Sequence, residues 1–140
     1  MGAGVALAGA GAWLVALTVY DVRQRRLPNA LTLPGAAVAL IVATLAGRGT
    51  GAALGAIALA ALYLVVHLSA PAAMGAGDVK LALGVGALTG AFGVDVWLLA
   101  AVAAPLLTAS WAVATRTRGA VPHGPSMCVA TAAAVALVII

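Results

Sequence analysis

The chain has 140 residues, of which 65% are hydrophobic and only 7% are charged, and its mean hydropathy is +1.20. Soluble domains carry about 25% charged residues, so this chain has too few charges to cover a water-facing surface. The formal net charge of +4 does not indicate nucleic-acid binding, because the basic residues lie between apolar runs. The single cysteine, Cys128, excludes an internal disulfide and a CxxC metal site.

Six apolar segments follow one another, and we expect an all-α, polytopic bundle of about six transmembrane helices. A spanning helix needs about 20 mostly apolar residues. The expected helices cover residues 3–20, 31–46, 52–68, 78–92, 94–114 and 125–140. Pro34 is expected in the first turn of the second helix, where its missing N–H is tolerated. The first segment has no Lys or Arg before it, so we interpret it as a retained helix rather than a signal peptide.

The loop charges predict an orientation. Six helices place the loops near residues 21–29, 69–77 and 115–124 on one side of the membrane. That side carries six basic residues, namely Arg23, Arg25, Arg26, Lys80, Arg116 and Arg118. The opposite side carries only Arg48. By the positive-inside rule, these three loops are cytoplasmic and both termini lie outside.

Three glycine pairs have small-xxx-small spacing: Gly47 with Gly51, Gly51 with Gly55, and Gly86 with Gly90. This spacing lets two helix backbones approach closely in a membrane. It serves either packing within one bundle, which we favour, or a dimer face in a homo-oligomer.

The chain contains three aspartates and no glutamate. We expect Asp21 to close the first helix and Asp78 to open the fourth, both at the cytoplasmic membrane boundary. Asp95 falls on the other side and is expected to be a solvated loop residue. An ionisable group at membrane depth is costly and suggests a function. The alternatives are that Asp78 only caps its helix and that the neighbouring arginines neutralise Asp21.

Two converging carboxylates can share one proton, because like charges a few ångströms apart cannot both ionise easily. The ionised carboxyl group then takes a proton from water, and the protonated one donates to a scissile carbonyl oxygen. This aspartic-protease chemistry needs no metal, so we expect neither a metal nor another cofactor. Gly75 and Gly77, just before Asp78, are expected to permit positive φ and close approach of a substrate backbone.

Both aspartates lie in distinctive local sequences. These are Tyr20-Asp21 with Arg26-Leu27-Pro28-Asn29, and Gly75-Ala76-Gly77-Asp78-Val79-Lys80-Leu81. Together they resemble the prepilin leader peptidase family, the GxGD-type intramembrane aspartic proteases of type IV pilus and related secretion systems. Residues 121–125, Val-Pro-His-Gly-Pro, are similar to that family's Pro-x-Gly-Pro stretch before the last helix. The short length is similar to the compact members that serve Flp/Tad-type pili.

The resemblance implies a single transmembrane peptidase domain over residues 1–140, with Asp21 and Asp78 as catalytic residues. It implies cleavage of the basic leader from prepilin-like or pseudopilin precursors at the cytoplasmic face of a bacterial plasma (inner) membrane. Residues that would bind substrate or shape loops are Pro28, Asn29, Gly75, Gly77 and Lys80. The expected partners are these precursors and the lipid bilayer, not nucleic acid. Larger members carry paired CxxC motifs linked to N-methylation; this chain has one cysteine, and we expect no N-methyltransferase activity.

Several alternatives stay open at the level of sequence. Lys80 and the Arg23, Arg25 and Arg26 cluster either anchor the chain at the interface or contact substrate. His67 and His123 are expected to be interfacial. A small proton-coupled transporter would use Asp21 or Asp78 as its proton carrier, although neither is placed mid-span. A non-catalytic pilus-assembly membrane subunit would keep the fold, although an intact aspartate pair argues against it.

Overall fold

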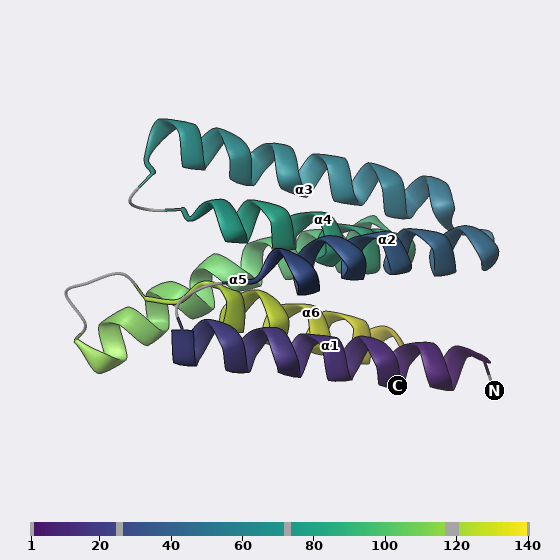
Figure 1. Ribbon diagram of the computed structural model, residues 1–140, viewed down its shortest axis with the longest axis horizontal. Helices are drawn as coiled ribbons and strands as arrows, with labels where there is room; N and C mark the ends of the chain where they lie inside the picture. Colours follow the sequence, from purple (N-terminus) through teal and green to yellow (C-terminus); the bar gives the residue numbers. More distant parts are fainter. Residues whose placement is uncertain (1, 25–26, 72–73, 117–120, 140) are drawn as a thin grey trace.

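The computed structural model describes residues 2–24, 27–71, 74–116 and 121–139. These residues form six helices and no strand: α1 (Gly2–Gln24), α2 (Asn29–Leu45), α3 (Gly49–Ser69), α4 (Ala76–Ala91), α5 (Val94–Thr115) and α6 (Gly124–Ile139). The helices run side by side along one axis, with the start of α1 and the end of α6 at the same end (Figure 1). The predicted all-α bundle is confirmed.

Three helices, α1, α3 and α5, are long and apolar enough to cross a membrane, and α2 and α6 are shorter apolar helices. The chain is therefore a membrane protein. The predicted order of the helices is confirmed, but two details of their ends were wrong. α1 continues to Gln24, so Asp21 lies within its last turn rather than after it. α2 begins directly after Pro28, whose carbonyl accepts the first helical N–H groups, and this places Pro34 in the second turn.

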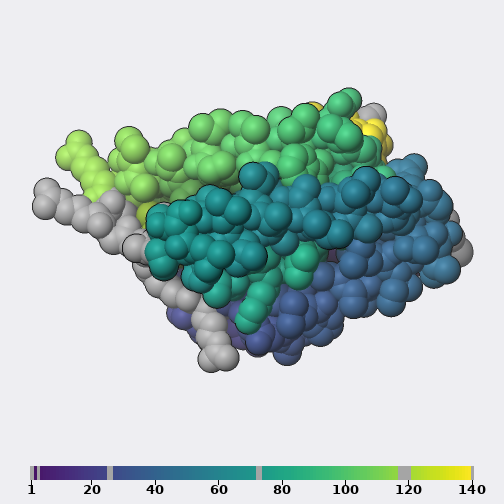
Figure 2. Space-filling model, turned by 90° about the horizontal axis from the view of Figure 1, so that it is seen from above, coloured from purple at the N-terminus to yellow at the C-terminus, as the bar shows by residue number. Residues whose placement is uncertain are grey.

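The centre of the bundle is α4, which packs against α2, α3, α5 and α6. Half of its 16 residues are buried, namely Leu81, Ala82, Gly84, Val85, Gly86, Ala87, Thr89 and Gly90. Five of these eight are glycine or alanine, so the helix is thin and its neighbours can approach it closely. Seen from above, α3 lies between α5 and α2 and covers this side of the bundle (Figure 2).

Four of the five motif glycines lie where α3 crosses α4, whereas Gly47 lies in the turn before α3. A Cβ atom built on Gly55 would meet the carbonyl oxygen of Gly86 and lie 2.9 Å from the Cα of Gly90. A Cβ on Gly51 would lie 2.8 Å from the Gly90 carbonyl oxygen. The indole N–H of Trp97, on α5, donates to the Gly55 carbonyl over 3.0 Å. These glycines therefore pack within one chain, the role that the sequence favoured.

We predict that Gly55→Ala destabilises the protein by about 1–3 kcal/mol, because the added methyl group forces two backbones apart. The matched control is Gly9→Ala, at an exposed helical site where a Cβ has no neighbour within 4 Å. That change should be neutral or stabilising, since alanine favours helix. Unfolding of the detergent-solubilised protein measures both. Equal stability of the two variants would contradict the packing role.

Candidate active site

One end of the bundle gathers three connecting segments, of which the structure describes residues 27–28, 70–71 with 74–75, and 121–123 (Figure 1, left). The last turn of α1 brings Asp21 to this end, and the first turn of α4 brings Asp78. Asp95 is exposed at the other end, as the sequence predicts, but it lies in the first turn of α5 rather than in a loop. The structure thus separates Asp95 from the other two aspartates.

Asp21 is buried, with 6% of its surface exposed. The backbone N–H of Gly124 donates to its Oδ2 over 2.8 Å. Gly124 is the first residue of α6, so the carboxylate faces the positive end of that helix. This contact offsets the unfavourable position of a negative charge at the C-terminal end of α1. A Cβ at Gly124 would collide with the Asp21 carboxylate, which explains the glycine.

Asp78 is the third residue of α4, and the N-cap is Gly75. The Asp78 carboxylate instead reaches back and accepts a hydrogen bond from the Gly75 backbone N–H. A role for Asp78 as a simple N-cap is therefore wrong. The Asp78 side chain instead bonds to the backbone N–H of the N-cap residue, as the third helical residue of a capping box does.

The expected positive φ before Asp78 is wrong. Gly75 is extended, with φ −75° and ψ 153°, and Gly77 lies within α4. Among the described residues, the positive-φ glycines are Gly47 and Gly93, in turns elsewhere. The absence of a side chain at Gly77 instead makes room for Leu27, whose Cβ would lie 3.2 Å from a Cβ there.

The two carboxylates lie close enough to interact electrostatically. Both carboxylates also interact electrostatically with the thiol of Cys128, which is buried in α6. The structure thus brings together Asp21 and Asp78, as the sequence predicts, from two helices that are distant in the chain. Two negative charges at such range oppose each other, so a state in which only one of the two groups is ionised is favoured over a state in which both are.

The other predicted site residues form a brace beside the aspartates. The Lys80 Nζ donates to the Asn29 Oδ1 over 2.9 Å, which ties α4 to the start of α2. Pro28 is the N-cap of α2, with an extended backbone. Arg23 is exposed in the last turn of α1, whereas Arg25 and Arg26 lie outside the described residues.

Sequence reasoning missed a polar cluster next to the aspartates. The His123 ring lies between the Tyr63 hydroxyl, 2.8 Å from Nε2, and the Thr108 hydroxyl, 2.6 Å from Nδ1. His123 is thus a bonded residue rather than a free interfacial one, and burial lowers its pKa to about 4. Its place in the Pro-His-Gly-Pro segment was visible, but nothing in the spacing links it to α3 or α5.

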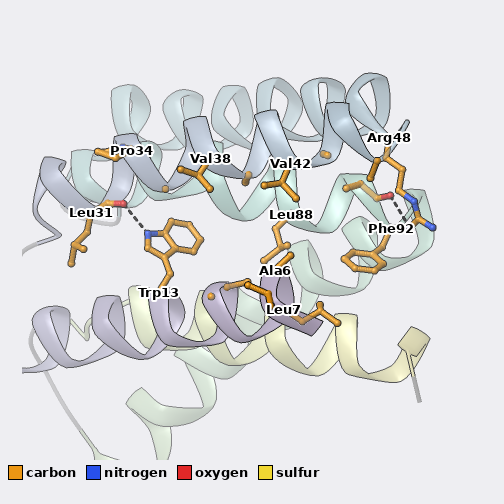
Figure 3. A pocket seen from close by; sticks show the side chains of 18 of the residues that line it. Ala6, Leu7, Trp13, Leu31, Pro34, Val38, Val42, Arg48, Leu88 and Phe92 are labelled. Carbon is orange, nitrogen blue, oxygen red and sulfur yellow. Dashed lines mark hydrogen bonds between the residues drawn. The ribbon is translucent and has the colours of Figure 1, made fainter. Parts of the chain in front are cut away.

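A cavity of about 790 Å³ forms an apolar groove between α1 and α2 (Figure 3). Trp13 lies at one end, where its indole N–H donates to the Leu31 carbonyl over 2.8 Å, and Arg48 lies at the other. Neither Asp21 nor Asp78 lines it. In the described part of the chain, no three His, Cys, Asp or Glu side chains gather to hold a metal ion.

Comparison with known proteins gives one finding. The model of the type IV leader peptidase family matches residues 8–140. No curated protein matches the chain significantly, and no solved structure does.

His123 predicts a pH dependence of stability. Its pKa is about 4 in the folded state and about 6.5 when unfolded. Above pH ~6.5 the ring is neutral in both states, and the protein has its full free energy of unfolding. As the pH falls from ~6.5 toward ~4, the unfolded ring binds a proton and the folded ring does not, so the free energy of unfolding falls by about 1.4 kcal/mol per pH unit. Relative to His123→Gln, the wild-type protein should lose stability more steeply over this range. Parallel unfolding curves of the two proteins between these pH values would refute the prediction.

Proposed function

The chain belongs to the type IV leader peptidase family, and from that premise we propose that it is a membrane aspartic endopeptidase with Asp21 and Asp78 as its catalytic residues. Its substrates are prepilin-like or pseudopilin precursors, from which it removes a short basic leader. The observation that carries the proposal is the electrostatic interaction between two carboxylates that α1 and α4 bring to one end of the bundle.

In the proposed reaction, one aspartate is ionised and the other protonated. The ionised carboxylate removes a proton from water as the oxygen attacks the scissile carbonyl carbon. The protonated carboxyl group donates its proton to the carbonyl oxygen, which gives a neutral tetrahedral diol. Collapse of the diol breaks the C–N bond, the amine leaves with a proton from the first carboxyl group, and the second carboxylate recovers its proton. Water is consumed, and no covalent enzyme intermediate forms.

The position of the aspartates suits a substrate that is half in water and half in lipid. Both lie within one turn of a helix end. A precursor whose basic leader stays in water and whose hydrophobic segment enters the bilayer would present its cleavage site at that depth. The brace between Lys80 and Asn29 lies beside this entry and is proposed to shape it.

We place the site at the cytoplasmic face of the bacterial inner membrane, because its end of the bundle carries Arg23, Lys80 and Arg116. In a Cys128→Ser background, Thr50→Cys should react with an impermeant maleimide added to spheroplasts. Gln24→Cys should react only after the membrane is opened. Labelling of residue 24 in sealed spheroplasts, without labelling of residue 50, would reverse the orientation.

We predict that Asp21→Asn and Asp78→Asn each lower cleavage about 10²- to 10⁴-fold, since neither amide can exchange the proton. Asn caps and accepts hydrogen bonds about as well as Asp, so a structural role alone predicts a mild effect. The assay uses a pilin-like precursor encoded beside this gene. The double variant should be no worse than either single one, because the two groups act as a unit.

The matched control is Asp95→Asn, which should cleave at the wild-type rate, because Asp95 is exposed at the opposite end. Near-normal cleavage by either of the other variants, at normal membrane abundance, would exclude that aspartate from catalysis. The same assay with S-adenosylmethionine tests the proposed lack of methyltransferase activity. The new amino terminus should keep its unmodified mass, and a gain of one methyl group would disprove that part.

A further inference from the structure

The His123 ring is hydrogen-bonded at both nitrogens. The Thr108 hydroxyl also donates to the Ala104 carbonyl over 3.2 Å, and on this basis we assign the proton of the neutral ring to Nδ1, with the Thr108 oxygen as its acceptor. The unprotonated Nε2 then accepts from the Tyr63 hydroxyl. The ring is thus neutral, with its proton on Nδ1. The low pKa of His123 keeps the ring uncharged at neutral pH. One ring thereby joins α3 to α5.

The backbone of the same residue begins α6. The His123 carbonyl accepts the N–H of Met127 over 3.0 Å, which is the first helical bond. The next N–H along the chain, that of Gly124, donates to Asp21. The hydrogen-bonded ring and the N–H that binds Asp21 thus belong to neighbouring residues at the start of α6.

We infer that His123 is a positioning residue for the carboxylates, held in place by Tyr63 and Thr108. It fixes the start of α6, and with it the N–H of Gly124 against Asp21. The inference rests on the proposed function, in which Asp21 is catalytic. His123 itself acts through Gly124 and exchanges no proton with substrate.

Four helices place a titratable side chain around this chain of hydrogen bonds. Asp21 comes from α1, Asp78 from α4, Cys128 from α6, and Tyr63, which interacts electrostatically with Asp78, from α3. From α5, the described contact to the ring is the uncharged Thr108. A looser Gly124 N–H would make the charged form of Asp21 less favourable. The acidic limb of the cleavage profile should then move to higher pH.

The first test uses Tyr63→Phe and Thr108→Val, which remove the two partners of the ring and keep the side-chain volumes. Each should lower kcat about tenfold, the effect of one hydrogen bond, with KM unchanged and the acidic limb shifted upward. The matched control is Thr89→Val. Thr89 is a buried helical threonine whose hydroxyl also donates to a carbonyl four residues back, but it has no contact with His123. It should keep the wild-type kcat and pH profile.

The second test needs no substrate. In detergent micelles, the ¹⁵N resonances of His123 should report the tautomer with its proton on Nδ1. The amide proton of Gly124 should move upfield and exchange faster with solvent in Tyr63→Phe and Thr108→Val, but not in Thr89→Val. An unmoved Gly124 amide would overturn the inference.

The outcomes separate this inference from the proposed function. If Asp21→Asn is inactive while Tyr63→Phe and Thr108→Val keep the wild-type kcat and pH profile, the positioning role falls and the proposed function stands. If these two variants only melt at lower temperature, with kcat per folded molecule and pH profile unchanged, the chain of hydrogen bonds is a purely structural brace. That result also overturns the inference. If Asp21→Asn cleaves normally, the proposed function itself fails.

Discussion

The close approach of α3 to α4 is the constraint on which the bundle depends. Gly51 and Gly55 lie against Gly86 and Gly90 with no side chains between the two backbones. In a membrane, the hydrophobic effect does not drive helices together, so such shape complementarity decides which helices pair. The pairing makes α4 the central helix although it is among the shortest, and it holds the helix that carries Asp78 against four neighbours.

A second constraint is electrostatic and explains how a buried carboxylate is tolerated at the end of α1. Asp21 would be disfavoured there by the negative end of its own helix. The start of α6 supplies the opposite partial charge and an N–H donor at 2.8 Å. Asp78 occupies the favourable first turn of α4 and bonds back to Gly75. Backbone N–H groups thus help to hold both aspartates in place.

Much of this arrangement could be predicted from the sequence, because length and hydropathy predict the helices, and the alternation of successive spanning helices predicts which ends lie together. Asp21 and Asp78 were expected at one end for that reason. The backbone before Asp78 was mispredicted, because a glycine in an extended or helical conformation looks the same in sequence as one with positive φ. The contacts of His123 with Tyr63 and Thr108 could not be predicted, since helical periodicity says nothing about how neighbouring helices are rotated toward each other.

The groove between α1 and α2 has a mechanical consequence. These helices contact each other little, and α1 packs chiefly on α6, while α2 and α3 pack on α4. The chain is thus divided into two groups of helices, with Asp21 in one and Asp78 in the other. Small relative sliding of the groups changes the separation of the carboxylates without unfolding a single turn. The indole of Trp13, which bonds across the groove to Leu31, resists such sliding, as do the hydrogen bonds of Trp97 to Gly55 and of His123 to Tyr63.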